Sequence, residues 1–509
     1  MGLFIKKPFE ALLAEANASG SKSLKRVLGP WSLVALGVGV IIGAGLFSIT
    51  GTVAAGYTGP AITLSFAIAA LGCCFAGLCY AEFASMIPVA GSAYTYSYAT
   101  MGELIAWIIG WDLILEMLMA GSVISKYWGV YLNDFMRLMG WNANTNLTFG
   151  SFHIDIAPII IVAFFTTLLV FGTKIGARVD GAMTVLKIAI VFFVVIVGFF
   201  YVKASNFTPF IPPSQPASTV EGSSAVTGVM TQPLWQFATG MTPSVYGVPG
   251  ILSGAALVFF AFIGFDVVAT ASEETKNPHK NVPLGIGVGM LLIIVMYMLV
   301  AVVTTGMVSY AELAKQDSPS LATAFELVGA DWAAKIISFG IVLGLATVVM
   351  VLLLGLTRIV FAMSRDGLLP RGLSKTGKHG TPAALQIVVG AVVALVAAFF
   401  DIGVLSDMVN IGTLSAFTLV AISIPIMRKK RPDLPRAFKM PGSPWIPILI
   451  AVANFWLMLN LSVLTWIRFV VWLVVGFAIY FGYGYWHARL GKGDLTETLS
   501  AETDKAVNG

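Results

Sequence analysis

The sequence predicts an all-α protein that crosses a lipid bilayer about twelve times. Three observations support this prediction. First, 58% of the 509 residues are hydrophobic and only 11% are charged, whereas a soluble protein carries about 25% charged residues. Second, apolar runs of about 20 residues recur along the chain. Third, the charged residues gather between these runs. A soluble chain this apolar would expose too much apolar surface to water, so the bilayer is its expected solvent.

Twelve runs have a length that suits a spanning helix, although the fourth is short. In chain order they are 31–54, 60–86, 104–132, 156–171, 179–202, 250–270, 282–305, 332–362, 382–400, 404–427, 445–466 and 469–487. The first 30 residues are polar and charged, and the run that follows is too long for the core of a cleavable signal peptide. We therefore expect the first run to be an uncleaved insertion signal.

The distribution of basic residues predicts the orientation. With the N-terminus in the cytoplasm, 22 Lys and Arg residues lie on the cytoplasmic side and five lie outside, as the positive-inside rule requires. We expect a multi-pass protein of the plasma membrane (the inner membrane of a bacterium) with both termini cytoplasmic. Because the basic residues sit at the ends of runs and form no stripe, no nucleic-acid partner is expected.

The runs divide the chain into seven expected segments. These are a cytoplasmic N-terminal segment (1–30), five helices (31–202), an extracellular loop (203–249), five more helices (250–427), a cytoplasmic loop (428–444), two C-terminal helices (445–488) and a cytoplasmic tail (489–509). The long loop is rich in Pro, Ser, Thr and Gly, and is either a disordered connector or a partial lid over an outer vestibule. Cys73, Cys74 and Cys79 lie in one apolar run and are expected to be packing residues, with no disulfide.

Two runs contain sequence that breaks a helix near the middle of the membrane. Residues 37–45 hold four glycines, each of which costs about 1 kcal/mol relative to alanine in a helix. The sixth run holds Gly264 and then Asp266 in an apolar setting. Broken helices at corresponding places in two halves of a chain indicate a transporter binding site. The two runs are five apart, and because five is odd, the second set of five helices would be inverted relative to the first.

A broken helix leaves backbone groups without partners, and these groups can bind a small molecule. The amides of Ala44, Gly45 and Leu46 begin the second half of the first run and suit a carboxylate, because they carry the positive end of the helix dipole. Freed carbonyls suit an ammonium group, so the two sets predict a zwitterionic α-amino acid as ligand. The expected carbonyls are those of Ile42, Phe260, Ala261 and Ile263, and Gly43 lies at the break itself. The alternative is tight helix packing through the GxxxG spacing of Gly39 and Gly43.

Ionisable residues inside the runs are costly and usually functional. Lys187 lies eight residues into the fifth run, roughly 12 Å deep at about 1.5 Å per residue, and a lysine so buried can lose its proton near neutral pH. We expect Lys187 to carry a coupling proton and, when charged, to bond the broken first helix. The alternative is a lysine that extends to the inner membrane surface.

Three of the acids within the runs are candidates for a role at the site. On the third run, Asp112 and Glu116 share a helix face, and Glu116 is expected to line the pocket or, alternatively, to bond a neighbouring helix. Asp266 is expected to hold a gate or to cap a strained turn.

Five motifs now point to a family. They are GVIIGAGLF at 39–47, YAEFASMIPVAGSAY at 80–94, FIGFD at 262–266, EETKNP at 273–278 and AMSRDGLLP at 362–370. With them the chain resembles the amino acid–polyamine–organocation superfamily, and within it the cationic amino acid transporter branch of bacterial size. The likeness extends over about residues 24–489.

The resemblance implies a LeuT-like fold, with five-plus-five inverted helices and two more. It also implies proton-coupled uptake or exchange of amino acids, with Lys187 at the place of a sodium ion. Glu116 matches the family's acid on the third helix. Met350 matches a residue of the eighth helix that limits side-chain room, so small or neutral substrates are expected.

Several alternatives remain open from the sequence. The same fold could serve an exchanger or a sodium-coupled carrier, although Lys187 argues against sodium. A nutrient receptor without turnover is the alternative from another class. An enzyme is not expected, because the four histidines form no HExxH zinc pattern. The expected partners are an amino acid, a proton and the bilayer. No cofactor or metal is expected, and the sequence indicates no particular partner subunit.

Overall fold

The computed structural model describes most of the chain. The described residues are 4–7, 28–86, 92–141, 145–149, 152–171, 174–219, 228–265, 268, 275–316, 319–375, 381–432, 436 and 438–488. Asp266, Glu273 and Glu274, which the sequence singled out, lie outside these ranges, as do most of the N-terminal segment and the tail after Ala488.

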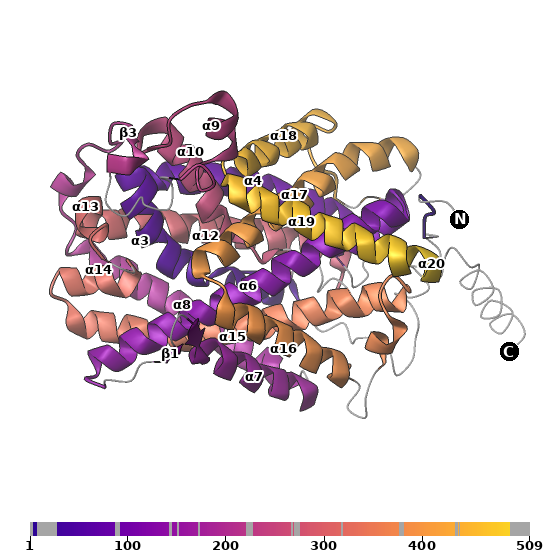
Figure 1. The fold of residues 1–509 in the computed structure, drawn as a ribbon, viewed down its shortest axis with the longest axis horizontal. Coiled ribbons are helices and arrows are strands. Elements are labelled where there is room, and N and C mark those ends of the chain that lie inside the picture. The colour runs from indigo at the N-terminus through magenta and orange to yellow at the C-terminus, as the bar shows by residue number, and fades with distance from the viewer. Residues whose placement is uncertain are drawn as a thin grey trace, which may run out of the picture.

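Long apolar helices form the body of the molecule (Figure 1). The helical segments before the long loop, including the short turns that join them, are α2 (Pro30–Ile41), η1 (Gly45–Ile49), α3 (Thr50–Val53), η2 (Ala54–Thr58), η3 (Gly59–Ala61), α4 (Ile62–Met86), α5 (Ser92–Thr100), α6 (Glu103–Leu138), α7 (Ile156–Phe171) and α8 (Lys174–Phe199). Those after it are α10 (Gly247–Val258), η7 (Phe259–Phe262), α12 (Pro278–Met307), α15 (Asp331–Arg365), α16 (Ala383–Phe399), α17 (Ile402–Lys430), α18 (Trp445–Leu459), α19 (Val463–Ile479), η10 (Tyr480–Gly484) and α20 (Tyr485–His487).

Short elements complete the described chain. They are the strand pairs β1 (Asn146–Phe149) with β2 (Phe152–Asp155) and β3 (Gln215–Pro216) with β4 (Ser244–Val245), both antiparallel, and the short helices η4 (Ala204–Phe207), η5 (Ala217–Thr219), α9 (Leu234–Thr239), α13 (Tyr310–Leu313), α14 (Leu321–Leu327) and η9 (Arg371–Ser374). Asn146 pairs with Asp155, and Gln215 with Val245.

The helices confirm an all-α protein that passes the membrane many times. Among the described residues, seven helical segments are long and apolar enough to span a bilayer, and five shorter apolar helices accompany them. The two longest helices, α6 and α15, pack along each other in the centre, α12 packs on α2 and α4, and α17 packs on α6. Each central helix has an acid in its first turn and an arginine in its last turn (Glu103 and Arg137, Asp331 and Arg365), which suits the helix dipole.

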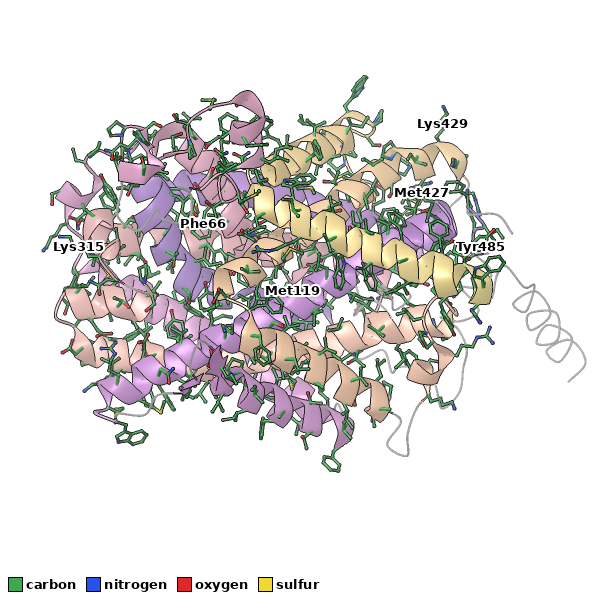
Figure 2. All side chains as sticks on the ribbon, viewed as in Figure 1. Phe66, Met119, Lys315, Met427, Lys429 and Tyr485 are labelled. Carbon is green, nitrogen blue, oxygen red and sulfur yellow. The ribbon has the colours of Figure 1, made fainter. Side chains whose placement is uncertain are left out.

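The two ends of the bundle differ. At one end, here called the N-terminal face, lie residues 4–7, α20 and Lys429, and at the opposite face lie β3, α13, α14 and Lys315 (Figures 1 and 2). The described part of the 203–249 loop lies on the opposite face and is bonded there. The amide of Leu234 donates to the carbonyl of Leu461, and that of Tyr246 to the carbonyl of Tyr57. The described part of the loop is therefore attached to the helical bundle at both of these places.

One predicted boundary is wrong. The sequence placed the last two spans at 445–466 and 469–487, but α18 ends at Leu459 and α19 begins at Val463. The chain turns at residues 460–462, where the hydroxyl of Ser462 accepts a hydrogen bond from the amide of Thr465 and caps α19. Apolar residues on both sides of this turn concealed it.

Candidate substrate and coupling site

The first membrane helix is interrupted where the glycines predict. Helix α2 ends at Ile41, the next residue has an extended backbone (φ −67°, ψ 95°), and helical structure resumes at Ala44 and η1. The amides of Ala44 and Gly45 open the second half directly after non-helical residues, so they have no helical turn before them to bond. The amide of Leu46 already donates to the carbonyl of Gly43 at 3.2 Å. The first prediction of a break is therefore confirmed.

The sixth membrane helix is interrupted as well. Helix α10 tightens into the 3₁₀ turn η7, and then Ile263 is extended (φ −69°, ψ 139°). Gly264 follows with φ +120°, a conformation that residues with a Cβ rarely adopt. The glycine thus permits the break at this position.

The two breaks lie in direct contact. A Cβ built on Gly45 would lie 2.3 Å from the Cα of Ala261, and one built on Gly264 would lie 2.7 Å from Val40. Both glycines therefore allow the two interrupted backbones to approach more closely than side chains permit. This brings together the two groups of residues that the sequence assigned to one site.

Tyr297 of α12 bridges the two breaks. Its hydroxyl oxygen lies 2.7 Å from the carbonyl oxygen of Ile41 and 2.8 Å from that of Ala261, so its single proton serves two freed carbonyls. The rings of Phe66 and Phe262 pack against the Tyr297 ring at centroid distances of 5.8 and 5.2 Å, and Phe66 lies in the interior of the bundle in Figure 2. Sequence reasoning missed Tyr297, although a tyrosine inside an apolar run signals a need for a polar partner.

Lys187 of α8 forms a hydrogen bond to another carbonyl near the end of α2, that of Gly39. Its Nζ donates to the carbonyl oxygen of Gly39 at 2.5 Å, and only 1% of the residue is exposed. Gly344 of α15 packs against its methylene chain, since a Cβ there would lie 3.0 Å from the lysine Cγ. The ammonium group therefore sits at the negative end of the α2 dipole. This is the contact that the sequence predicted, and it excludes a lysine that extends to the membrane surface.

A small cavity lies against both breaks. Its free volume is about 20 Å³, which is room for about one water molecule. The space would therefore have to widen before it could admit an amino acid. Its walls contain no ionisable side chain. They are formed by Val40, Ile41, Gly43, Ala44, Gly45, Ala120, Ile124, Phe260, Ile263, Val348 and Leu352.

The remaining predicted residues are buried near this cavity but do not line it. Ile42, Leu46 and Ala261 lie at the breaks without contributing to the wall. Glu116 is fully buried in α6, one turn before Ala120. Met350 is 4% exposed on α15, but at about 100° per residue it points well away from Val348 and Leu352, which do form the wall.

Sequence reasoning missed six residues of the wall. Two of them, Val40 and Ile41, adjoin the first break, and the other four close the cavity from α6 and α15: Ala120, Ile124, Val348 and Leu352. A signal did exist on α6, because Ala120 and Ile124 follow Glu116 at four-residue intervals and share its face. On α15 the apolar residues form no distinguishable stripe. No group of three or more His, Cys, Asp or Glu residues in the described part of the chain is arranged to hold a metal ion.

The chain is similar to known proteins along most of its length. The model of the amino acid permease family matches residues 28–483. The chain is 43% identical to the branched-chain amino acid permease BcaP of Bacillus subtilis, over 96% of this chain and 99% of that protein. It is 40% identical to the methylthioribose transporter of Bacillus subtilis, over 96% and 99% of the two chains.

A plant relative is more distant. The chain is 36% identical to the vacuolar cationic amino acid transporter 4 of Arabidopsis thaliana, over 81% of this chain and 65% of that one. The relatives are transporters rather than enzymes, and the family model covers nearly the whole chain. The chain therefore belongs to the amino acid permease family, within the amino acid–polyamine–organocation superfamily.

Proposed function

We propose that this permease carries L-amino acids with apolar side chains across the plasma membrane by alternating access, in symport with a proton. The observation that carries the proposal is the bond from Lys187 to the broken first helix beside an apolar cavity. We also propose that the two breaks mark an inverted repeat of the LeuT type, with both termini in the cytoplasm.

The backbone at the breaks would hold the two charged ends of the substrate. The amides that begin the second half of the first helix, at Ala44, Gly45 and Leu46, suit the carboxylate. The ammonium group suits the carbonyl of Ile42 and the carbonyls of the sixth helix. The Ala261 carbonyl accepts from Tyr297 in this structure, so it would have to share its second lone pair with the substrate.

The cavity wall would select the substrate side chain. Ala120 and Ile124 of α6 and Val348 and Leu352 of α15 present only aliphatic groups. A cationic substrate would bring a charge against them without a partner, which is costly in a membrane interior. These aliphatic walls would suit a branched or small aliphatic side chain once the space widens, in line with the name of the branched-chain relative.

Lys187 would couple transport to the proton. A charged ammonium that bonds a freed carbonyl contributes about 1.5–3 kcal/mol. When the lysine gives up its proton, this contribution falls, and the end of α2 becomes free to move relative to α8. Binding and release of one proton would thus alternate the position of the first break.

Uptake of L-isoleucine into proteoliposomes with an imposed pH gradient tests the proposal. We expect Lys187→Ala to abolish gradient-driven uptake. The matched control is Lys126→Ala, because Lys126 is another lysine within a span but bonds the Ala397 carbonyl and Asp155, away from the breaks. Unchanged pH-driven uptake by Lys187→Ala would exclude the proton role.

Further measurements separate the remaining alternatives. Isoleucine counterflow without net uptake would indicate an exchanger, and loss of uptake on replacement of sodium would indicate a sodium-coupled carrier. Binding without counterflow would indicate a receptor.

A further inference from the structure

A second ionisable residue lies buried between two membrane helices. Asp112 of α6 is 0% exposed, and its Oδ2 accepts a hydrogen bond of 2.7 Å from the hydroxyl of Ser415 on α17. Its Oδ1 is buried and has no hydrogen-bond partner among the described residues. The carboxyl group therefore has one neutral donor and an oxygen without any.

In the described part of the chain, no cation compensates a charge at this position. Among the described residues, no lysine, arginine or histidine forms an ion pair with Asp112. Helices α7 and α16, which also pack on α6, contain no ionisable residue. An ionised carboxylate here would be an unpaired buried charge, which is strongly unfavourable.

The other ionisable groups around α6 have different positions or partners. Glu116 lies one turn further along α6 and would repel a second negative charge. On α17, Asp407 accepts from Thr465 of α19, and on α5, Tyr94 donates to Asp366. Two helices that pack on α6 carry an arginine away from the helix ends: Arg358 in α15 and Arg468 in α19. Neither arginine pairs with Asp112.

The interface also leaves little room for water. A Cβ built on Gly412 of α17 would lie 3.2 Å from the Leu115 side chain and 3.6 Å from the carbonyl oxygen of Asp112. The two backbones are thus close beside the carboxyl group. The close approach favours a neutral, protonated carboxylic acid that bonds Ser415.

Helix α17 connects this acid to the substrate site. The side-chain amide of Asn410 donates to the carbonyl of Leu257 at 3.3 Å, just before the second break. The ring of Phe417 packs against Phe259 on one side of the break and Phe265 on the other, at centroid distances of 5.8 and 4.9 Å. A displacement of α17 from α6 would therefore pull on both sides of the second break.

We propose that Asp112 is a second proton-binding site, distinct from Lys187, and that its proton holds α17 against α6 in the substrate-binding geometry. Loss of this proton at high pH places an unpaired charge in the α6–α17 interface. The interface then loosens, and through Asn410 and Phe417 the second break loosens with it.

Thermal unfolding of the purified full-length protein between pH 6 and pH 9, without substrate, tests this inference. Wild type is expected to lose stability as the pH rises, and Asp112→Asn, which resembles the neutral acid, is expected to lose most of that pH dependence. Ser415→Ala removes only the hydrogen bond, so it lowers the melting temperature but keeps the pH dependence. In a Lys187→Ala background, Asp112→Asn should still remove its own share of the pH dependence, which separates this proton from the one proposed for transport. A pH dependence in Asp112→Asn equal to that of wild type overturns the proposal.

A second measurement covers the case in which Asp112→Asn does not fold. The infrared spectrum of Asp407→Asn protein at pH 7 should contain the C=O band of a protonated carboxylic acid that shifts when aspartate is labelled with ¹³C in the side-chain carboxyl. No labelled band of this kind would mean that Asp112 is ionised, and the proposal would be wrong.

Discussion

Replacing Gly45 with alanine tests whether the two breaks form one site through direct backbone contact. The added Cβ would lie 2.3 Å from the Cα, 2.6 Å from the Cβ and 3.0 Å from the amide nitrogen of Ala261. Two of these atoms belong to the backbone, so no side-chain rotation relieves the overlap. The two helix halves must move apart instead.

The size of the effect follows from these distances. Ordinary contact begins near 3.4 Å, so the backbones must separate by about 1 Å at this point. Overpacking of this kind costs about 1–3 kcal/mol of stability. A misplacement of about 1 Å also costs roughly 100-fold where several groups must act on one ligand, so we expect L-isoleucine affinity to fall by about that factor.

Equilibrium binding of radiolabelled L-isoleucine to purified protein measures the affinity, and thermal unfolding measures the stability. The matched control is Gly287→Ala in α12, where a Cβ meets no atom within 4 Å, so binding should match wild type. In the double variant, Ala261→Gly removes the atom at 2.6 Å but leaves the Cα at 2.3 Å, and binding should stay weak. Affinity in Gly45→Ala within twofold of wild type would refute the close contact of the two breaks.

Three further substitutions test other parts of the structure. Tyr297→Phe leaves two buried carbonyls without their donor, so it should destabilise the protein by about 1–3 kcal/mol in thermal unfolding; an unchanged melting temperature would contradict the bridge. Val348→Ala enlarges the cavity wall and should shift competition towards bulkier apolar amino acids by about 10-fold or more, whereas Met350→Ala, off the wall, should not. Glu82→Gln removes the buried carboxylate that pairs with Arg428, which should cost about 3–5 kcal/mol; wild-type unfolding in denaturant would show that this pair is not essential.

The sequence predicted the features of the fold that involve unusual residue types. Gly45 and Gly264 stand where a membrane helix should be continuous, and Lys187 stands where a charge is costly. Each violates an ordinary preference of membrane helices, and each lies at the site in the structure. Such a residue can be recognised from a single sequence, because an apolar membrane helix gives no reason for a glycine or a charge at that position.

The side-chain wall could not be predicted in the same way. Val348 and Leu352 are ordinary residues for an apolar helix, and only the rotation of α15 against α6 decides that they face the cavity while Met350 does not. Packing sets this rotation, for instance through the contact of Gly344 with the Lys187 chain. The family resemblance suggested Met350 because a resemblance transfers a residue's position along the helix. Whether that residue lines the cavity depends instead on which way its side chain points around the helix axis.

The distribution of donors around the breaks explains why Lys187, of all these contacts, suits a coupling role. Lys187 of α8 donates a hydrogen bond to the carbonyl of Gly39. The hydroxyl of Tyr297 on α12 donates to the carbonyls of Ile41 and Ala261. Each break is therefore held by a helix other than its own, and any movement of the breaks has to exchange these bonds. The tyrosine hydroxyl offers the same single donor at every physiological pH. Of the two donors, the lysine is the one that can change its charge and its number of donors. In the proposed symport, its proton would decide when the first break is held and when it is released.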